Sequence, residues 1–166
     1  MPHVRPLTVA DRPEFLPLRL HSVTEHPECY ATTAENVRSA PLAKTDALLS
    51  AGATGSVVFG AFDEALVGVL GCKRDDRETV DHYATLWGFF LHQDARGRGL
   101  GAALLTAAIE HARGLGLDYL RLGVPVSSDA ALRVFEAQGF TRYGLEVGAR
   151  KMGARRIDQA YLRLGL

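Results

Sequence analysis

The chain has 166 residues with 19 basic and 19 acidic side chains, so its formal net charge is zero and it lacks the basic excess typical of nucleic-acid-binding proteins. Hydrophobic residues make up 47% of the chain, which fits an ordinary globular protein, and the length predicts one domain over residues 1–166. Two cysteines, Cys29 and Cys72, are too few for a disulfide framework and predict a reduced, cytoplasmic setting. We expect no signal peptide and no membrane span, because no apolar run is long enough.

The first third of the chain predicts one strand followed by short helices. We expect a strand at Val4–Val9 and a helix at about Arg12–Val23. Asp11 would cap this helix, and Pro17 would delay its start or kink it. Later elements are a polar connection at Glu25–Tyr30, a helix at Ala34–Ser39 after Thr33, a helix near Ala47–Ser50 after Thr45 or Asp46, and a loop at Ala51–Gly55.

The middle of the chain predicts three strands. Ser56–Phe62 and Leu66–Cys72 are expected to form a hairpin that turns at Asp63-Glu64. The charged segment Lys73–Glu78 is interpreted as a solvated loop. His82–Leu91 predicts a buried central strand, because it is apolar on both faces toward its end.

The last third alternates helices and strands. The expected elements are a helix at Ala102–Arg113, a strand at Tyr119–Val124, a helix from Ser127 or Ser128 to Gln138, and strands at Phe140–Val147 and Asp158–Leu164. Gly114 and Gly139 follow the two helices as glycine caps. The basic segment Arg150–Arg156 is interpreted as a solvated hairpin tip. The order of elements predicts a mixed α/β fold.

The segment Arg96–Ala102, with the sequence RGRGLGA, carries the most specific information, because a glycine-rich turn there joins a strand to a helix start. Glycine lets a ligand approach the main chain, and the free amides of a helix N-terminus attract anions. Arg96 and Arg98 add forked, charged donors that suit phosphate. The segment therefore predicts a site for a phosphate-bearing ligand.

Several interpretations compete for this segment. A Walker loop is excluded, because no Gly-Lys-Ser/Thr follows the glycines. The dinucleotide fingerprint matches as Gly97-x-Gly99-x-x-Ala102, but the next strand ends at Val124-Pro125-Val126 without the acidic residue that would hold a ribose. A purely structural turn with solvated arginines is a further alternative.

A longer pattern covers this segment and much of the remaining chain. Arg96-x-x-Gly99-x-Gly101 resembles the acyl-CoA diphosphate motif Q/R-x-x-G-x-G/A of the GNAT superfamily of N-acetyltransferases. Ala131–Phe140, with the sequence ALRVFEAQGF, resembles the family's A-x-x-x-Y-x-x-x-G-F helix. Weaker resemblances lie at Arg5-Pro6-Leu7-Thr8-x-x-Asp11, at Tyr143-Gly144-x-Glu146 and at Ile157-Asp158-x-x-Tyr161-Leu162.

The resemblance implies a GNAT fold, in which a central mixed, mostly antiparallel sheet is flanked by helices and one parallel strand pair splays apart. These strands would end near Leu91 and Val124, and acetyl-CoA would lie in the opening as cosubstrate. The residues implied to bind it are Phe89, Leu91, Arg96, Gly97, Arg98, Gly99, Leu100, Gly101, Ala102, Ser128 and Phe135. Ser128 stands where the family often has an asparagine, and it also suits a helix N-cap.

The reaction implied is direct transfer of an acetyl group from acetyl-CoA to a primary amine in a ternary complex. The amine must lose a proton, and a main-chain amide near Phe90 or Leu91 would stabilise the oxyanion. His82 and Glu28 are the candidate bases, and ordered water is an alternative.

Two positions depart from the family pattern. The family's thiolate-facing tyrosine is Phe135 here, and its frequent glutamate on the fourth strand is replaced by Trp87. Another tyrosine, with Tyr30 and Tyr143 as the candidates, a water molecule or no acid at all would then serve the leaving thiolate. Because of these departures, a catalytically weak acyl-CoA-binding or sensing module remains the alternative function.

The expected partners follow from the same resemblance. The acceptor would be a small-molecule or peptide amine, with no nucleic acid, membrane or metal involved. Relatives commonly pair through their late strands, and the resemblance therefore includes a homodimer among the expected assemblies. The basic segment Arg150–Arg156 would meet the adenosine phosphate or an acidic acceptor if it is not simply solvated.

Overall fold

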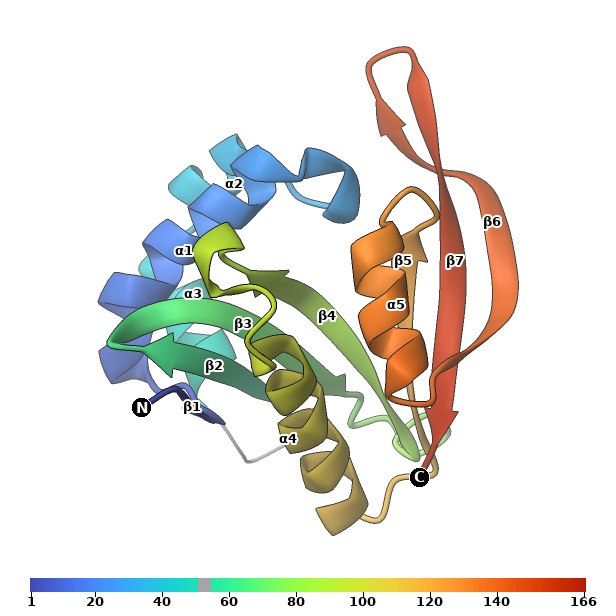
Figure 1. The fold of residues 1–166 in the computed structure, drawn as a ribbon, viewed down its shortest axis with the longest axis horizontal. Helices are drawn as coiled ribbons and strands as arrows, with labels where there is room; N and C mark the ends of the chain where they lie inside the picture. The colour runs from blue at the N-terminus through green and yellow to red at the C-terminus, as the bar shows by residue number, and fades with distance from the viewer. Residues whose placement is uncertain (51–54) are drawn as a thin grey trace.

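A computed structural model describes residues 1–50 and 55–166 and places seven strands in one sheet (Figure 1). In spatial order these strands are β1 (His3–Pro6), β2 (Val57–Asp63), β3 (Ala65–Arg74), β4 (Tyr83–Leu91), β5 (Tyr119–Pro125), β7 (Arg155–Gly165) and β6 (Thr141–Met152). Neighbouring strands are antiparallel except for β4 and β5, which are parallel. The predicted mixed, mostly antiparallel sheet is therefore confirmed.

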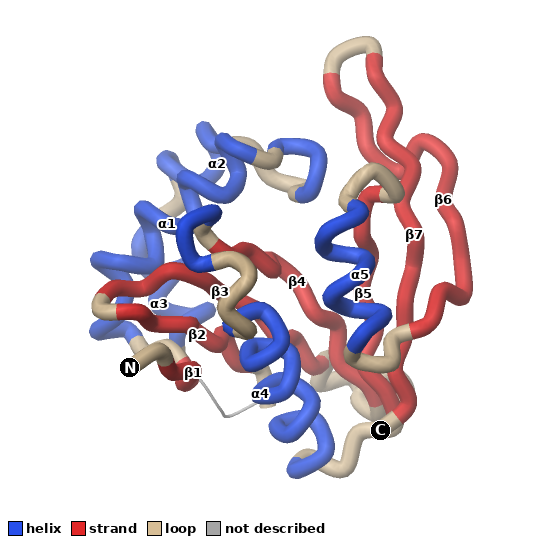
Figure 2. The backbone as a smooth tube through the Cα atoms, in the orientation of Figure 1, coloured by secondary structure: helices blue, strands red, loops and turns tan. Residues whose placement is uncertain are grey.

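Helices cover both faces of this sheet (Figure 2). They are α1 (Arg12–Glu25), α2 (Ala34–Ser39), α3 (Leu42–Leu49), α4 (Leu100–Gly114) and α5 (Asp129–Ala137), with single 3₁₀ turns at Val9–Asp11, Pro27–Cys29 and Gln93–Ala95. Helices α4 and α5 pack on one face, and α1 and α3 pack on the other. None of the helices in the described residues is long and apolar enough to cross a membrane.

The alternation of side chains along β2 shows how the two faces are separated. Val57 and Phe59 point into the larger core beneath α4 and α5, whereas Val58 and Phe62 point into the smaller core beneath α1 and α3. Because successive side chains of a strand face opposite sides, the apolar strand predicted from the sequence fills both cores at once.

Strands β4 and β5 pair over only three residues each, from Tyr83 to Thr85 on β4 and from Tyr119 to Arg121 on β5. Beyond that point β4 continues to pair with β3, and β5 continues to pair with β7. The sheet therefore opens between the two strands, as the predicted splayed pair requires. Within the opening, β4 carries a bulge, and Gly88 there has a φ of 67°, a left-handed conformation that favours glycine.

Three expectations for the N-terminal half differ from the structure. The first strand ends at Pro6 instead of Val9, because a 3₁₀ turn follows it. Asp11 lies at the N-cap position of α1, but its carboxylate accepts hydrogen bonds from Arg5 and Thr8 instead of capping the helix. Helix α3 starts at Leu42 and not after Thr45 or Asp46.

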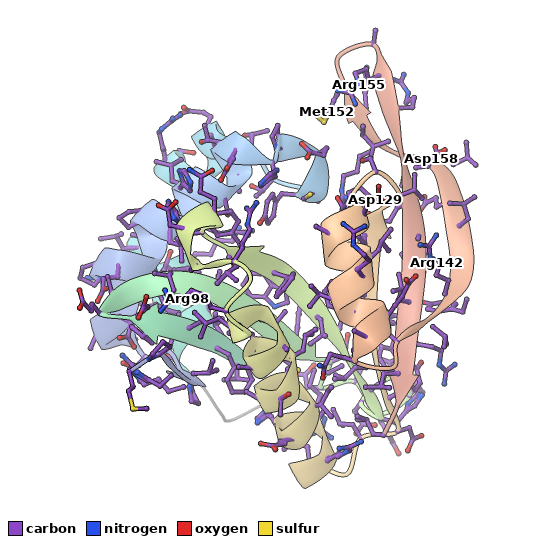
Figure 3. The ribbon with its side chains drawn as sticks, viewed as in Figure 1. Arg98, Asp129, Arg142, Met152, Arg155 and Asp158 are labelled. Carbon is purple, nitrogen blue, oxygen red and sulfur yellow. The ribbon has the colours of Figure 1, made fainter. Side chains whose placement is uncertain are left out.

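Other element boundaries shift by one to five residues. Pro17 lies inside α1 without ending it. Strand β3 includes the first residues of the segment predicted as a charged loop and ends at Arg74. Strands β6 and β7 extend to Met152 and Arg155, near the hairpin tip in Figure 3, so most of the predicted basic turn is paired strand. Of the loop predicted at residues 51–55, residues 51–54 lie outside the described part of the chain.

Candidate functional site

The glycine turn after β4 presents bare main chain. Gly97 and Gly99 have φ values of 74° and 79°, and a Cβ added to either would meet no atom within 4 Å. Gly99 is the N-cap residue of α4. In the described structure the amides of residues 97–99 donate no hydrogen bond, and the first turn of a helix leaves its own amides without partners. These amides form a concave, partially positive surface that fits an anion.

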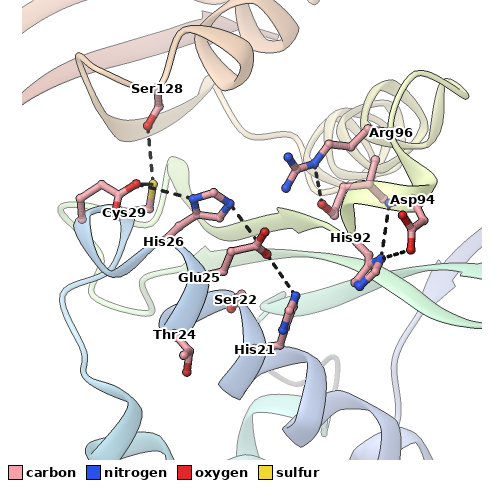
Figure 4. A network of polar contacts seen from close by, with 12 residues as sticks. His21, Ser22, Thr24, Glu25, His26, Cys29, His92, Asp94, Arg96 and Ser128 are labelled. Atoms are coloured by element: carbon pink, nitrogen blue, oxygen red, sulfur yellow. Dashed lines mark hydrogen bonds and ion pairs between the residues drawn. The ribbon is translucent and has the colours of Figure 1, made fainter.

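The two arginines of this turn have different partners. Arg98 pairs with Asp63 at the end of β2, with 2.5 Å between Nη1 and Oδ2, and Figure 3 shows it on that side of the molecule. Arg96 folds back, and its Nε donates to the carbonyl oxygen of Leu91 at 3.0 Å (Figure 4). Arg98 therefore anchors the turn to the β2–β3 hairpin, while Arg96 stays beside the end of β4.

Aromatic packing fixes the start of α4 against β4 and α5. A Cβ on Gly101 would approach Cζ of Phe89 to 3.3 Å, so glycine allows the ring to lie close to the helix. Phe89 contacts Phe135 edge to face at 5.2 Å between ring centroids, and Phe135 contacts Phe140 at 5.6 Å. Phe135 is only 1% exposed, and Leu100 is also buried, so both side chains belong to the core that supports the site.

Two connected cavities occupy the opening between β4 and β5. The smaller, of about 70 Å³, lies toward α5 and is lined by Phe89, Ser128, Ala131 and Phe135 among others. The larger is a cleft of about 820 Å³ that is bounded by α1, the segment after it and the β6–β7 hairpin. Residues shared by both linings mark their junction: Cys29, Tyr30, Leu86, Trp87, Gly88, Leu122 and Gly123. The two cavities therefore adjoin at these residues.

Tyr30 lies at the junction of the two cavities. Its hydroxyl donates to the carbonyl oxygen of Phe89 at 3.5 Å, within the unpaired part of β4. Burial raises the pKa of Tyr30 above its usual value near 10, so the phenol stays protonated at neutral pH. Tyr143, the other predicted proton donor, also lines the cleft but is 52% exposed.

Ser128 and Cys29 meet across the opening (Figure 4). Ser128 lies at the N-cap position of α5, yet its hydroxyl forms no capping hydrogen bond. Instead Oγ lies 3.5 Å from Sγ of Cys29. Burial raises the pKa of the Cys29 thiol, so it is neutral near pH 7. Ser128 also lines the smaller cavity.

The two predicted bases occupy different surroundings. His82 is exposed just before β4, packs against the rings of Tyr83 and Tyr119, and lines neither cavity. Glu28 is half-buried and adjoins Cys29 at the junction, with its carboxylate 3.6 Å from Nδ1 of His26. Neither side chain lines a cavity, but Glu28 adjoins Cys29, which lines both, whereas His82 lies before the start of β4.

Sequence reasoning missed three long polar side chains of the cleft. These are Arg19 on α1, Arg121 on β5 and Gln159 on β7. One signal was available for Arg19, because it lies four residues from both Phe15 and Val23 on the buried stripe of α1. A charged residue on such a stripe points to a polar site beneath the helix.

Comparisons with known proteins agree on one family. Residues 20–140 match the model of the acetyltransferase (GNAT) family. A mycothiol acetyltransferase of Actinosynnema mirum is 33% identical over 122 residues, which cover 74% of this chain and 38% of that protein. A mycothiol acetyltransferase of Thermobispora bispora is 43% identical over 58 residues, covering 35% of this chain and 20% of that protein. The matched regions span well under half the length of these curated relatives.

Solved structures share the fold along the whole chain. A GNAT-family acetyltransferase from Streptococcus pneumoniae superposes with a TM-score of 0.89 at 21% identity, covering 100% of both chains. A phosphinothricin acetyltransferase from Sinorhizobium meliloti in complex with AcCoA gives a TM-score of 0.83 at 20% identity, covering 99% of this chain and 88% of that chain.

Proposed function

The chain belongs to the GNAT acetyltransferase family, and we propose that it transfers an acetyl group from acetyl-CoA to a primary amine. The observation that carries this proposal is the opening between β4 and β5, where a small cavity on the α5 side adjoins a large cleft on the α1 side and where β4 leads into the bare glycine turn. A donor and an acceptor held on opposite faces would meet at this junction, as direct transfer in a ternary complex requires.

The residues present fit acetyl-CoA on the α4–α5 face. The amides of residues 97–102 would hold its diphosphate, since a side chain at Gly97 or Gly99 would occupy that space. The part of β4 that does not pair with β5, over Phe89 and Leu91, would hydrogen-bond the pantetheine amides in the manner of an added strand. The side chains of Tyr30 and Arg96, which donate to the carbonyl oxygens of these two residues, would share those acceptors with the cosubstrate or release them. Ser128 and Phe135 would line the path of this arm. The cosubstrate supplies the thioester from which the acetyl group is taken.

Side chains of this chain would take part in two proton transfers, one to the leaving thiolate and one from the amine. Tyr30 is proposed to protonate the leaving thiolate, because its hydroxyl is buried at the junction and stays protonated at neutral pH. Glu28 or a water molecule beside it would accept the proton of the amine. The positive charges of the cleft lower the pKa of an incoming ammonium group, which favours the neutral nucleophile.

The proposal is tested by release of coenzyme A thiol from acetyl-CoA with a broad panel of small-molecule and peptide amines. Turnover with any amine, and its loss on Gly99→Asp, is the expected result. Tight binding of acetyl-CoA without turnover for any amine would contradict the enzyme and support the sensing module.

We also propose that the chain pairs with a second copy through β6. This strand is at the edge of the sheet, and its Leu145 and Val147 side chains are 62% and 77% exposed. Light scattering during gel filtration is expected to give the mass of a dimer, and Val147→Lys is expected to give a monomer. A wild-type monomer at high concentration would contradict the pairing.

A further inference from the structure

Three arginine side chains from three different elements line the cleft on the α1 face: Arg19 of α1, Arg121 of β5 and Arg150 of β6. No Asp or Glu is among the described residues of the lining, and none of the three arginines forms an ion pair with a described carboxylate. Charge of one sign in a concave, partly desolvated site concentrates ligands of the other sign. The cleft is therefore built for a ligand with a negative charge.

Arg19 has the fewest partners of the three. Arg121 donates from Nε to Oγ1 of Thr85 at 3.2 Å, and Arg150 donates from Nη1 to the carbonyl oxygen of Glu28 at 3.2 Å. Nη1 of Arg19, in contrast, is buried and has no hydrogen-bond partner among the described residues. A buried charged donor without a partner costs free energy, which a bound anion would recover.

The guanidinium of Arg19 is held in place close to the opening of the sheet. Its Cζ lies 4.9 Å from the ring centroid of Tyr30 and 5.5 Å from that of Trp87. Its Nη1 lies only 3.3 Å from the position that a Cβ of Gly88 would take, beside the bulge of β4. An anion bound to Arg19 would thus lie next to the place where we propose that the amine is acetylated.

A second unpartnered polar atom lies on the opposite wall. Gln159 is 8% exposed, and its Oε1 has no hydrogen-bond partner among the described residues. Its side chain packs over Gly123, where a Cβ would approach Nε2 to 2.1 Å, and Gly123 lines both cavities. A buried acceptor at the junction suits the N–H group of an amine.

We propose that the acceptor carries a carboxylate or another oxyacid group close to its amine, and that Arg19 binds this group. The inference rests on the proposed function only in treating the ligand as the acceptor of the acetyl group. The binding of the acid does not depend on acetyl transfer. In the bound state the acid would satisfy Nη1 of Arg19 while the amine faces Oε1 of Gln159. Arg121 and Arg150 would add long-range attraction from the outer walls.

Trp87 provides a readout that does not need activity. It is the only tryptophan of the chain, and it lines the cleft beside Arg19. The probes are matched amines that differ in one group: L-methionine, L-phenylalanine and L-glutamine with their carboxamides, and β-alanine with β-alaninamide. 2-Aminoethylphosphonate, which shares the linker of β-alanine, separates carboxylates from phosphorus oxyacids. Each probe is titrated against the fluorescence of the protein saturated with coenzyme A.

Acids are expected to change the fluorescence with saturation, and at least one acid is expected to bind about 10- to 100-fold more tightly than its carboxamide. Arg19→Gln is expected to remove this preference. Arg19→Lys keeps the positive charge but lacks the forked guanidinium, and it is expected to keep part of the preference for acids. Arg113→Gln, an exposed arginine in the last turn of α4, is the control and is expected to bind like the wild type.

Two results would overturn the inference. One is that the wild-type protein binds the carboxamides of the panel as tightly as the acids, or more tightly. This result does not depend on any variant being correctly folded. The other is an unchanged acid preference in Arg19→Gln. Thiol release with the acids that bind tests the proposed function separately, since binding of acids without release would contradict the transferase and leave the acid site standing.

Discussion

The two faces of the sheet contribute to the site in different ways. On the α4–α5 face the anion site is main chain, formed by the turn that contains Gly97 and Gly99, and it depends on side chains being absent. On the α1 face the cleft is formed by side chains, with Arg19, Arg121 and Gln159 projecting from three elements. The first surface suits the part of a ligand that is the same in every reaction. The specificity of the second surface can change with a single substitution.

This contrast has a physical consequence for mutation. A main-chain site is lost when any side chain enters it, because the donors themselves cannot be moved. A side-chain site loses affinity for one ligand and can gain another, since its charge and shape depend on the residues chosen. The following experiments, from the largest expected effect to the smallest, test whether the two faces are separable.

Gly99→Asp is expected to have the largest effect, with loss of at least about 100-fold in coenzyme A affinity, because a carboxylate would enter the anion site and the residue would keep a φ of 79°. Gly116→Asp is the matched control, since Gly116 has a φ of 69°, is equally open, and follows the opposite end of α4. The control is expected to lose about 1 kcal/mol of stability but no affinity. Calorimetric titration with coenzyme A measures the affinity of both variants. Equal losses of affinity in the two variants would contradict a main-chain site.

Tyr30→Phe is expected to lower kcat by about 100-fold while leaving coenzyme A affinity nearly unchanged, because the hydroxyl acts at the junction and not on the diphosphate. Tyr143→Phe is the control on the cleft side and is expected to change kcat less than threefold. Burial raises the pKa of Tyr30 above 10, so protonated Tyr30 remains available between pH 7 and 10 and the wild-type rate should show no loss of an acid in that window. Similar kcat values for both variants would remove Tyr30 from the mechanism.

Glu28→Gln is expected to reduce kcat by about 10-fold, because the carboxylate that relays the proton of the amine would be lost. His82→Ala is expected to leave kcat unchanged, because His82 lies before β4 and packs against the rings of Tyr83 and Tyr119. Comparing kcat of the two variants distinguishes the predicted bases; a loss of kcat in His82→Ala alone would reverse the assignment.

Asp11→Asn is expected to affect neither face, since Asp11 lines neither cavity, but to lower the free energy of unfolding by about 1–3 kcal/mol near pH 7. Hydrogen bonds from Arg5 and Thr8 hold the pKa of Asp11 well below its usual value of 3.8. A carboxyl group whose pKa is lower in the native than in the unfolded state stabilises the fold at pH values above the unfolded pKa. This contribution is lost as the pH falls from the unfolded pKa through the native pKa. Denaturant unfolding at pH 7 and pH 3 should show a smaller difference between variant and wild type at pH 3.

The glycine turn, α4 and the strand before it could be predicted because their requirements are local. A left-handed residue at Gly99 needs glycine, and the helix that follows has a continuous apolar stripe. The splayed strand pair was expected from the family resemblance, but no local pattern marks where the pairing ends. For this reason His82 was a candidate base, although β4 and β5 are still together one residue later, at Tyr83.

The acceptor side could not be predicted, because tertiary packing assembles it. Arg19, Arg121 and Gln159 lie far apart in the sequence, and only Arg19, on the apolar stripe of α1, carries a local signal. Helix α3 shows the same limitation on a smaller scale, since Thr45 has a favoured capping side chain but is buried inside the helix, at 6% exposure.

The most direct test of the two-face account is the crystal structure of the complex with coenzyme A. The account predicts diphosphate oxygens at about 3 Å from main-chain amides within residues 97–102, with the pantetheine arm along β4 on the α5 side. A diphosphate bound to Arg19 or Arg121 in the cleft on the α1 face would contradict it.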